Sequence, residues 1–168
     1  MFMKLRDRPT RRSGFTIVEL LIVIVVIAIL AAITIVAYNG IQDRAKFVQK
    51  EGDIKNLQKL VEMYKAAYGS YPTTSGGWRY QRTSGNDFIP GIVPEFASTL
   101  PQVTDGPTGS GTNNTYIYIS NGTDYKLMRL YQPSIPAGEW AQVPASMKDQ
   151  NSSYTDRWGV WSPGGAGF

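Results

Sequence analysis

Apolar and polar positions divide the chain into three stretches, of which the first is a long apolar run. From Phe15 to Tyr38 the only charged side chain is Glu19, four residues into the run. As an α-helix these 24 residues would be about 36 Å long at ~1.5 Å per residue, which exceeds the ~30 Å hydrocarbon core of a bilayer. The pattern therefore predicts a membrane-spanning helix over residues 15–38.

The second stretch, residues 39–69, has the pattern of an amphipathic helix. Its apolar side chains recur at spacings of three, four and seven, and charged residues such as Lys50 lie between them. Gly69 is expected to end the helix, and the pair Asn39-Gly40 marks the point where the helix is expected to be weakest. The apolar stripe, which is expected to pack on the C-terminal domain, consists of Phe47, Ile54, Leu57, Val61, Tyr64 and Tyr68.

The third stretch, residues 70–162, alternates loops with short β-strands. Residues 115–131 have a strand-like alternation on both sides of Asn121-Gly122, a preferred sequence for a two-residue hairpin turn. A further strand is expected around Trp158–Trp161, and a flexible glycine-rich tail over 163–168. We therefore predict an α+β fold, in which the second half of a long N-terminal helix packs on a small antiparallel sheet of three or four strands. Apolar residues between 88 and 100 are expected to pack onto this sheet or helix.

Composition excludes several kinds of chemistry. The 168 residues contain neither cysteine nor histidine, so disulfides, thiolate zinc sites and histidine-dependent catalytic triads are excluded. The net charge of +4 is concentrated at the N-terminus. Residues 1–14 hold five of the 17 Lys and Arg but only one of the 13 Asp and Glu. The rest of the chain therefore holds twelve basic and twelve acidic side chains, and its net charge is zero. The basic character of the chain is therefore no indication of nucleic-acid binding.

The basic residues before the apolar run indicate its orientation. Under the positive-inside rule, residues 1–14 stay in the cytoplasm and the C-terminal part lies outside it. Two simple interpretations fit this pattern: a secretory signal peptide cleaved near Ala31-Ala32, or a plain anchor that carries an extracytoplasmic domain. The apolar run continues well past these alanines, and neither interpretation explains Gly14 or Glu19.

The N-terminal region also resembles a known family. The stretch "SGFTIVELLIVIVVIAILAAI" resembles the signature of type IV prepilins and of the pseudopilins of type II secretion, which have a short basic leader ending in glycine before a long apolar helix. The stretch "NLQKLVEMYKAAYGSYPTTSGGW" is similar to the corresponding part of major pseudopilins, which favours pseudopilin-like members. The residues that match the family signature directly are Gly14, Phe15, Thr16, Glu19 and Leu20.

The resemblance implies roles for three residues. A membrane-embedded prepilin peptidase would remove the leader, residues 1–14, by cleaving between Gly14 and Phe15. Glycine suits this position because a backbone without a side chain can enter a protease cleft in an extended form. Phe15 would become the new N-terminus, whose amine is commonly N-methylated in the family. Glu19 would pair with the ammonium group of Phe15 on a neighbouring subunit, because an unpaired carboxylate in lipid costs several kcal/mol.

The resemblance also implies partners and a location. The protein would be inserted once in the bacterial inner membrane, in contact with lipid, and would form a polymer with copies of itself and with related pilin subunits. An inner-membrane assembly platform and its ATPase would drive extension of a cell-surface or periplasmic filament for adhesion, motility, DNA uptake or protein secretion. The alternative from another class is a membrane-anchored extracytoplasmic binding module that does not polymerise.

No residue pattern points to an enzyme, a cofactor or a metal site. Asp105 and Asn113 fall far short of the six or more oxygen ligands that calcium requires, so the calcium-binding loop of major pseudopilins is not carried over to this chain. The spacing of the acids Asp87, Glu95 and Glu139 gives no support for a glycosidase pair.

One small cluster could contact DNA. Arg79 and Arg82 lie beside Trp78 and Tyr80, a combination of basic and aromatic side chains that can bind a phosphate backbone and stack on bases. The cluster is small and has no repeated pattern, so it supports DNA binding only weakly. The aromatic side chains are more simply explained by packing in the core and hairpin.

Overall fold

The computed structural model describes residues 14–103, 113–151 and 153–168. The predicted leader before Gly14 and the loop that contains Asp105 lie outside these described residues. The chain divides between Asn39 and Gly40 into two compact units.

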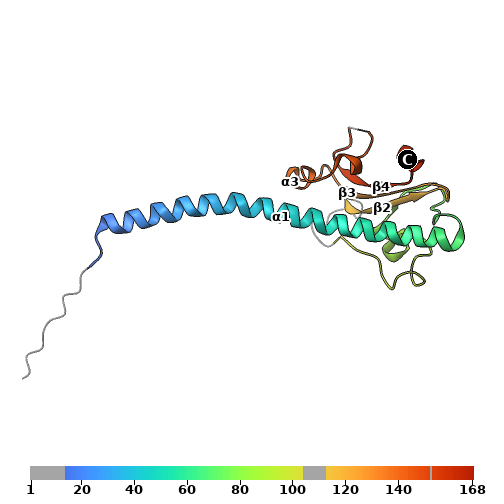
Figure 1. Cartoon of the computed structure of the whole chain (residues 1–168), viewed down its shortest axis with the longest axis horizontal. Coiled ribbons are helices and arrows are strands. Elements are labelled where there is room, and N and C mark those ends of the chain that lie inside the picture. Colours follow the sequence, from blue (N-terminus) through green and yellow to red (C-terminus); the bar gives the residue numbers. More distant parts are fainter. Residues whose placement is uncertain (1–13, 104–112, 152) are drawn as a thin grey trace, which may run out of the picture. The chain divides into compact units, whose positions relative to one another are not determined.

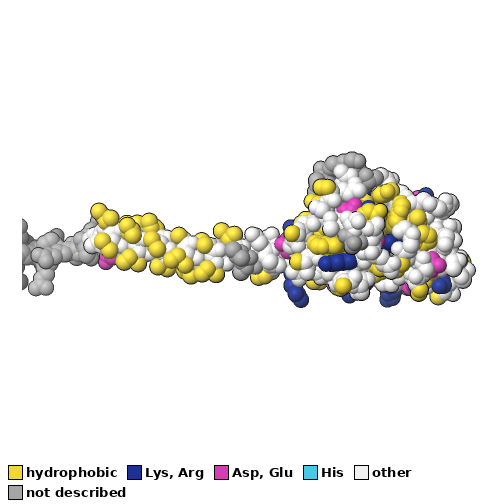
Figure 2. Space-filling view, turned by 90° about the horizontal axis from the view of Figure 1, so that it is seen from above, with side chains coloured by type: hydrophobic (Ala, Val, Ile, Leu, Met, Phe, Trp, Pro, Cys, Tyr) yellow, Lys and Arg dark blue, Asp and Glu magenta, His cyan; other side chains and the backbone are white. Residues whose placement is uncertain are grey.

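The first unit contains the N-terminal part of the predicted long helix, α1 (Ile17–Tyr68). From Phe15 to Ile35 the large apolar side chains are all exposed, with exposed fractions from 47% to 86%. Figure 2 shows hydrophobic side chains along the visible face of this segment. By length and composition it could cross a membrane, and lipid would remove this apolar surface from water. Asn39 and Gly40 are both helical, so the helix is not interrupted at the predicted weak point.

In the second unit, α1 presents the predicted apolar stripe to the core of the domain. Ile54, Leu57 and Val61 are fully buried. Tyr68, at the end of the stripe, is 53% exposed and packs the edge of its ring against Phe96. The 3.6-residue period of the sequence therefore identified the buried face of the helix correctly. The last turn of α1 lies at the edge of the core.

α1 ends at the position that the sequence predicts. Gly69 has a φ of +78°, a left-handed conformation that glycine adopts without strain, and its N–H donates to the carbonyl of Lys65 at 2.8 Å. Lys50, one of the charged residues between the apolar positions, is buried. A charged residue can occupy the core-facing side of a helix when a distant part of the chain supplies its counter-charge, and spacing along the helix does not reveal such a partner.

The second unit contains a four-stranded antiparallel sheet with the strand order β1-β2-β3-β4. Figure 1 labels β2, β3 and β4 of this sheet. The predicted hairpin and the predicted strand at Trp158–Trp161 are confirmed, whereas β1 was not predicted because two residues are too few to show an alternation. The strands are β1 (Arg79–Tyr80), β2 (Asn114–Ser120), β3 (Tyr125–Tyr131) and β4 (Arg157–Trp161). Short helical turns connect them: α2 (Gln81–Ser84), η1 (Gly85–Phe88), α3 (Ala137–Trp140) and η2 (Ala145–Met147), with η3 (Gly165–Gly167) after β4.

The predicted two-residue turn of the hairpin is wrong. Ser120 pairs with Tyr125, so the loop consists of the four residues between them. Asn121 Oδ1 accepts hydrogen bonds from the backbone N–H groups of Thr123 (2.9 Å) and Asp124 (2.8 Å). These side-chain bonds stabilise a wider loop than the Asn-Gly pair alone would indicate.

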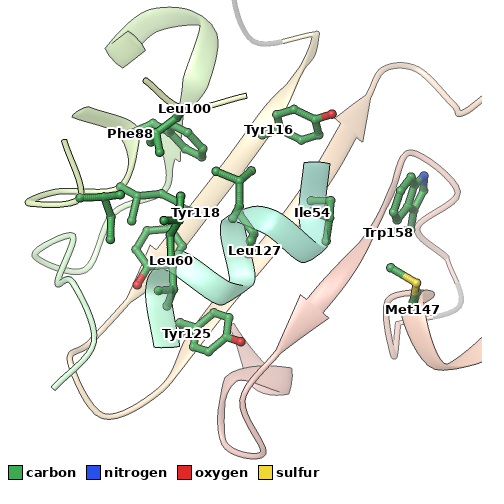
Figure 3. Packing of buried hydrophobic residues seen from close by; sticks show 14 of the residues in the cluster. Ile54, Leu60, Phe88, Leu100, Tyr116, Tyr118, Tyr125, Leu127, Met147 and Trp158 are labelled. Atoms are coloured by element: carbon green, nitrogen blue, oxygen red, sulfur yellow. The ribbon is translucent and has the colours of Figure 1, made fainter. Parts of the chain in front are cut away.

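Both faces of the sheet are buried. The tyrosines of the hairpin face α1, and Figure 3 shows their rings around the helix together with aliphatic side chains. The segment between 88 and 100 packs into this cluster, as predicted. The residues on this side include Leu57, Phe88, Ile92, Leu100, Tyr116, Tyr118, Tyr125, Leu127 and Trp158. The opposite face holds Ile117, Met128 and Leu130, which Trp78, Tyr80 and Trp161 cover.

Residues 163–168, predicted as a flexible tail, contain the turn η3 and make hydrogen bonds to the sheet. The ammonium group of Lys126 on β3 donates to the carbonyl oxygens of Ala166 and Phe168, both at 3.1 Å. The same ammonium forms an ion pair with Asp149 at 3.1 Å, and these side chains are only 1% and 6% exposed. We call Lys126, Asp149 and the two carbonyl groups the C-terminal clamp. Glycine-rich composition suggested flexibility, but a buried lysine supplies hydrogen bonds that composition does not reveal.

Candidate processing and assembly site at the start of α1

The predicted cleavage site lies just before the first helical residue. Gly14, Phe15 and Thr16 are outside regular secondary structure, and α1 begins at Ile17. Phe15 is 86% exposed. Apart from Gly14 itself and its two neighbours in the chain, no described atom lies within 4 Å of the position of a Cβ added to Gly14. The Gly14–Phe15 peptide bond is therefore accessible and non-helical, as a protease requires of the bond that it cleaves.

Thr16 and Glu19 cap the start of the helix reciprocally. The backbone N–H of Thr16 donates to Glu19 Oε2 at 2.7 Å, and the Thr16 hydroxyl donates to the same oxygen at 2.9 Å. In return, the backbone N–H of Glu19 donates to Thr16 Oγ1 at 3.2 Å. The first helical hydrogen bond, from Leu20 N to Thr16 O at 3.2 Å, follows directly. This is a capping box, in which each side chain satisfies a backbone N–H that the helix leaves unpaired.

The capping box gives Glu19 a role that the sequence analysis missed. The signal was present, because threonine followed three residues later by glutamate before an apolar run is the signature of this motif. The carboxylate also lies at the positive end of the helix dipole, where a negative charge is stabilised. Both hydrogen bonds that it accepts from described residues are to Oε2. The described residues donate no hydrogen bond to Oε1.

The residues considered for DNA contact make contacts within the domain. Arg79 Nη1 donates to the carbonyl of Asp87 at 3.0 Å, and Arg82 Nε donates to the carbonyl of Asn114 at 2.8 Å. The neighbouring Trp78 covers the outer face of the sheet. These contacts hold the segment 78–88 against β2.

The three acids considered as candidates for a glycosidase pair lie in separate environments. Glu139 is buried between Lys50, whose ammonium lies 3.3 Å from Oε2, and Trp158, whose indole N–H donates to Oε1 at 3.3 Å. Glu95 accepts a hydrogen bond from the hydroxyl of Tyr68 at 2.6 Å, which raises the pKa of that tyrosine. Asp87 is exposed in η1. Within the described parts of the chain, no three acidic side chains gather as a metal site would require.

Comparison with known proteins gives one family model and several relatives. Residues 9–35 match the family model of the prokaryotic N-terminal methylation motif. The chain is 37% identical over 67 residues to type II secretion system core protein G of Pseudomonas aeruginosa, a match that covers 40% of this chain and 47% of that protein. It is 33% identical over 114 residues to the protein of that name from Vibrio cholerae, covering 67% of this chain and 73% of that protein. No solved structure matches the chain.

The extent of these matches differs between relatives. The matched region spans about half the length of the Pseudomonas aeruginosa and Aeromonas hydrophila proteins, 47% in each case. The longer match to the Vibrio cholerae protein extends into the second unit. Its 114 residues cannot be contained in the first unit, which consists of residues 1–39. The capped apolar helix, the methylation motif and the helix-on-sheet domain together define a pilin-like subunit. Within that class, the chain belongs to the type IV prepilin and type II secretion pseudopilin family.

Proposed function

We propose that this protein is a structural subunit of a type II secretion pseudopilus, or of a closely related type IV pilus. It is inserted in the inner membrane by residues 15–38, cleaved between Gly14 and Phe15, and polymerised through the apolar segment. The observation that carries the proposal is the single carboxylate, Glu19, which is exposed at the start of a helix whose neighbouring side chains are apolar and unburied. Such a charge is costly in lipid and is retained in membrane segments for a functional partner.

The capping box supports the cleavage step. Thr16 fixes the start of α1 at Ile17, so the peptide bond between Gly14 and Phe15 remains two residues outside the helix. The peptidase can bind this bond in an extended conformation without first unwinding a helical turn. Hydrolysis then generates a free amine on Phe15, four residues before Glu19, and N-methylation of this amine would retain its positive charge.

Assembly follows from the new charge. The ammonium of Phe15 on one subunit pairs with Glu19 on its neighbour, and Oε1 is the carboxylate oxygen that the capping box leaves for it. Burying the two charges together offsets a desolvation penalty of several kcal/mol per ion, which either charge would meet alone in lipid. The pairing therefore favours entry of a subunit into the filament and fixes the register between neighbouring helices.

The relatives support a place in a secretion system. They are core proteins of type II secretion, so we infer that this subunit assembles with related pseudopilins, outside the cytoplasm and anchored in the inner membrane. A prepilin peptidase, an assembly platform and its ATPase complete the machinery. The function is mechanical, since the filament transmits extension and the subunit itself performs no reaction.

Replacing Glu19 tests the proposal against a membrane anchor that never polymerises. Glu19→Val removes the charge, and Glu19→Asp keeps it on a shorter side chain. Both variants should insert in the membrane, but the first should yield few sheared filaments and the second an intermediate amount. Thr16→Val is the matched control for helix capping, because it removes the threonine hydroxyl but leaves the carboxylate. Equal filament yield from Glu19→Val and the unmodified protein would reject a role of this charge in assembly.

A further inference from the structure

A polar pocket lies within the second unit, between the end of α1 and the loop of the hairpin. Its volume is about 480 Å³, which falls within the range of ~300–1,000 Å³ that is typical of small-molecule sites. We call this site the hairpin pocket. The side chains that line it are those of Lys65, Ser70, Tyr71, Thr73, Asn121 and Thr123.

Backbone hydrogen bonds hold the wall of the hairpin pocket in place. The N–H of Tyr71 donates to the carbonyl of Gly122 at 2.8 Å, which joins the chain after α1 to the hairpin loop. The N–H of Thr74 donates to the carbonyl of Ser120 at 3.0 Å. Within the loop, Asn121 Oδ1 accepts two backbone hydrogen bonds. The pocket is therefore preformed, so that binding does not require this part of the chain to become ordered first.

Several polar groups of the hairpin pocket are available to a ligand. Because Asn121 uses Oδ1 within the loop, its Nδ2 group presents two N–H donors. The hydroxyls of Ser70 and Thr123 make no hydrogen bond to a described residue, and a hydroxyl can both donate and accept. These groups suit a ligand with many hydroxyl or carbonyl oxygens, whereas an apolar ligand would leave them without partners.

Lys65 gives the hairpin pocket a positive charge. Its ammonium lies 4.1 Å from the centre of the Tyr71 ring. A hydrogen bond with the Tyr71 hydroxyl raises the pKa of Lys65 above its ordinary value, so the side chain is cationic at neutral pH. Among the described residues that line the pocket, none is acidic. A single cation without an acid at its side favours a ligand with one negative group.

The two acids nearest to Lys65 are bound within the domain. Glu62 accepts hydrogen bonds from the hydroxyls of Tyr71 and Tyr125, both at 3.2 Å. Asp124 Oδ1 accepts hydrogen bonds from the Ser162 hydroxyl at 2.6 Å and from the N–H of Gly164 at 3.0 Å. Both carboxylates therefore have donors outside the pocket, and the ammonium of Lys65 can bind a further anionic group.

We propose that the hairpin pocket binds a sugar that carries one carboxylate. The carboxylate pairs with the ammonium of Lys65, and the sugar oxygens bind Asn121, Ser70 and Thr123. Two kinds of glycan share this chemistry: cell-wall glycan, through the lactyl carboxylate of N-acetylmuramic acid, and acidic polysaccharides, through uronic acids. The inference goes beyond the proposed function, because the site lies within the second unit and does not require assembly of a filament.

Titration of the full chain with four sugars tests this proposal. The chain is kept in micelles of lauryldimethylamine oxide, a detergent without a sugar group, and binding is followed through the amide NMR signals of residues 69–73 and 121–123. N-acetylmuramic acid is compared with N-acetylglucosamine, and glucuronic acid with glucose, so that each acid has a neutral counterpart. An acid should bind at least about threefold more tightly than its counterpart, since the ion pair is partly exposed. The tighter of the two acids identifies the source of the glycan.

Variants locate the binding in the hairpin pocket. Lys65→Met should remove the preference for an acid over its neutral counterpart, while Lys59→Met, the matched control on the exposed side of α1, should retain it. Ser70→Ala removes one exposed hydroxyl and should weaken binding of the acid and of the neutral sugar by about two- to tenfold. Ser98→Ala, an exposed serine outside the pocket, is its control and should leave binding unchanged.

Two results would overturn the proposal. One is that neither acid shifts the signals of the pocket residues, and the other is that Lys65→Met and Lys59→Met bind the acids equally well. These measurements do not depend on filament assembly, so their failure leaves the proposed function unaffected.

Discussion

Removing the ammonium group of the C-terminal clamp should destabilise the domain strongly. In Lys126→Met, the carboxylate of Asp149, only 6% exposed, loses its cation, and the carbonyl groups of Ala166 and Phe168 lose a donor. Removing one partner of a buried ion pair costs about 3–5 kcal/mol, because the other charge stays buried without compensation. This is a large part of the ~5–15 kcal/mol that stabilises a typical domain.

Denaturant unfolding of the full chain in detergent micelles measures this effect. Tryptophan fluorescence follows unfolding of the domain, and one of the four tryptophans, Trp161, has its ring centre 5.5 Å from the ammonium of Lys126. Lys59→Met is the matched control, since Lys59 is exposed on α1, and it should change the free energy of unfolding by less than about 0.5 kcal/mol. The double variant Lys126→Met/Asp149→Leu should be more stable than Lys126→Met, because no buried charge remains unpaired. A loss of less than about 1 kcal/mol for Lys126→Met would refute the clamp as an anchor of the C-terminal residues.

Three further predictions concern the core of the second unit. Leu57→Ala removes a fully buried side chain between helix and sheet and should reduce the free energy of unfolding by about 2–5 kcal/mol in the same assay. Gly91→Ala should cost about 1–3 kcal/mol, because Gly91 has a φ of +74° and an added Cβ would lie 2.9 Å from the ring of Tyr64; a neutral result would contradict this packing. Burial raises the pKa of Tyr118 and Tyr125 above the ordinary value of 10.0, so stability should be constant below about pH 10 and fall as the pH rises towards the folded-state pKa. Unfolding measured between about pH 9 and pH 11 should show this fall, and replacing both tyrosines with phenylalanine should flatten it.

The long helix and the hairpin of the fold could be predicted well from local patterns in the sequence. The apolar stripe on α1 and the alternation around Asn121-Gly122 each result from one repeating geometry, so Ile54, Leu57 and the hairpin strands could be placed from periodicity alone. Features that depend on a distant partner could not be placed in this way. Lys50 is buried because Glu139, 89 residues away, supplies its counter-charge.

The position of the candidate site could be predicted from the sequence, but the prediction of its geometry was incomplete. Gly14, Phe15 and Glu19 were identified through their resemblance to a family signature, and Thr16 was treated only as a matching residue. The reciprocal hydrogen bonds between Thr16 and Glu19 follow from a local motif that the sequence contains. The glycine-rich C-terminus shows the opposite case, because its order depends on Lys126 from β3, which no local pattern could indicate.

The mature N-terminus of the protein in sheared filaments tests the central claim most directly. Mass spectrometry of these filaments should give a chain that begins at N-methylated Phe15 and lacks residues 1–14. A chain that retains these residues in cells with an active prepilin peptidase, or one that begins near Ile33, would contradict the account.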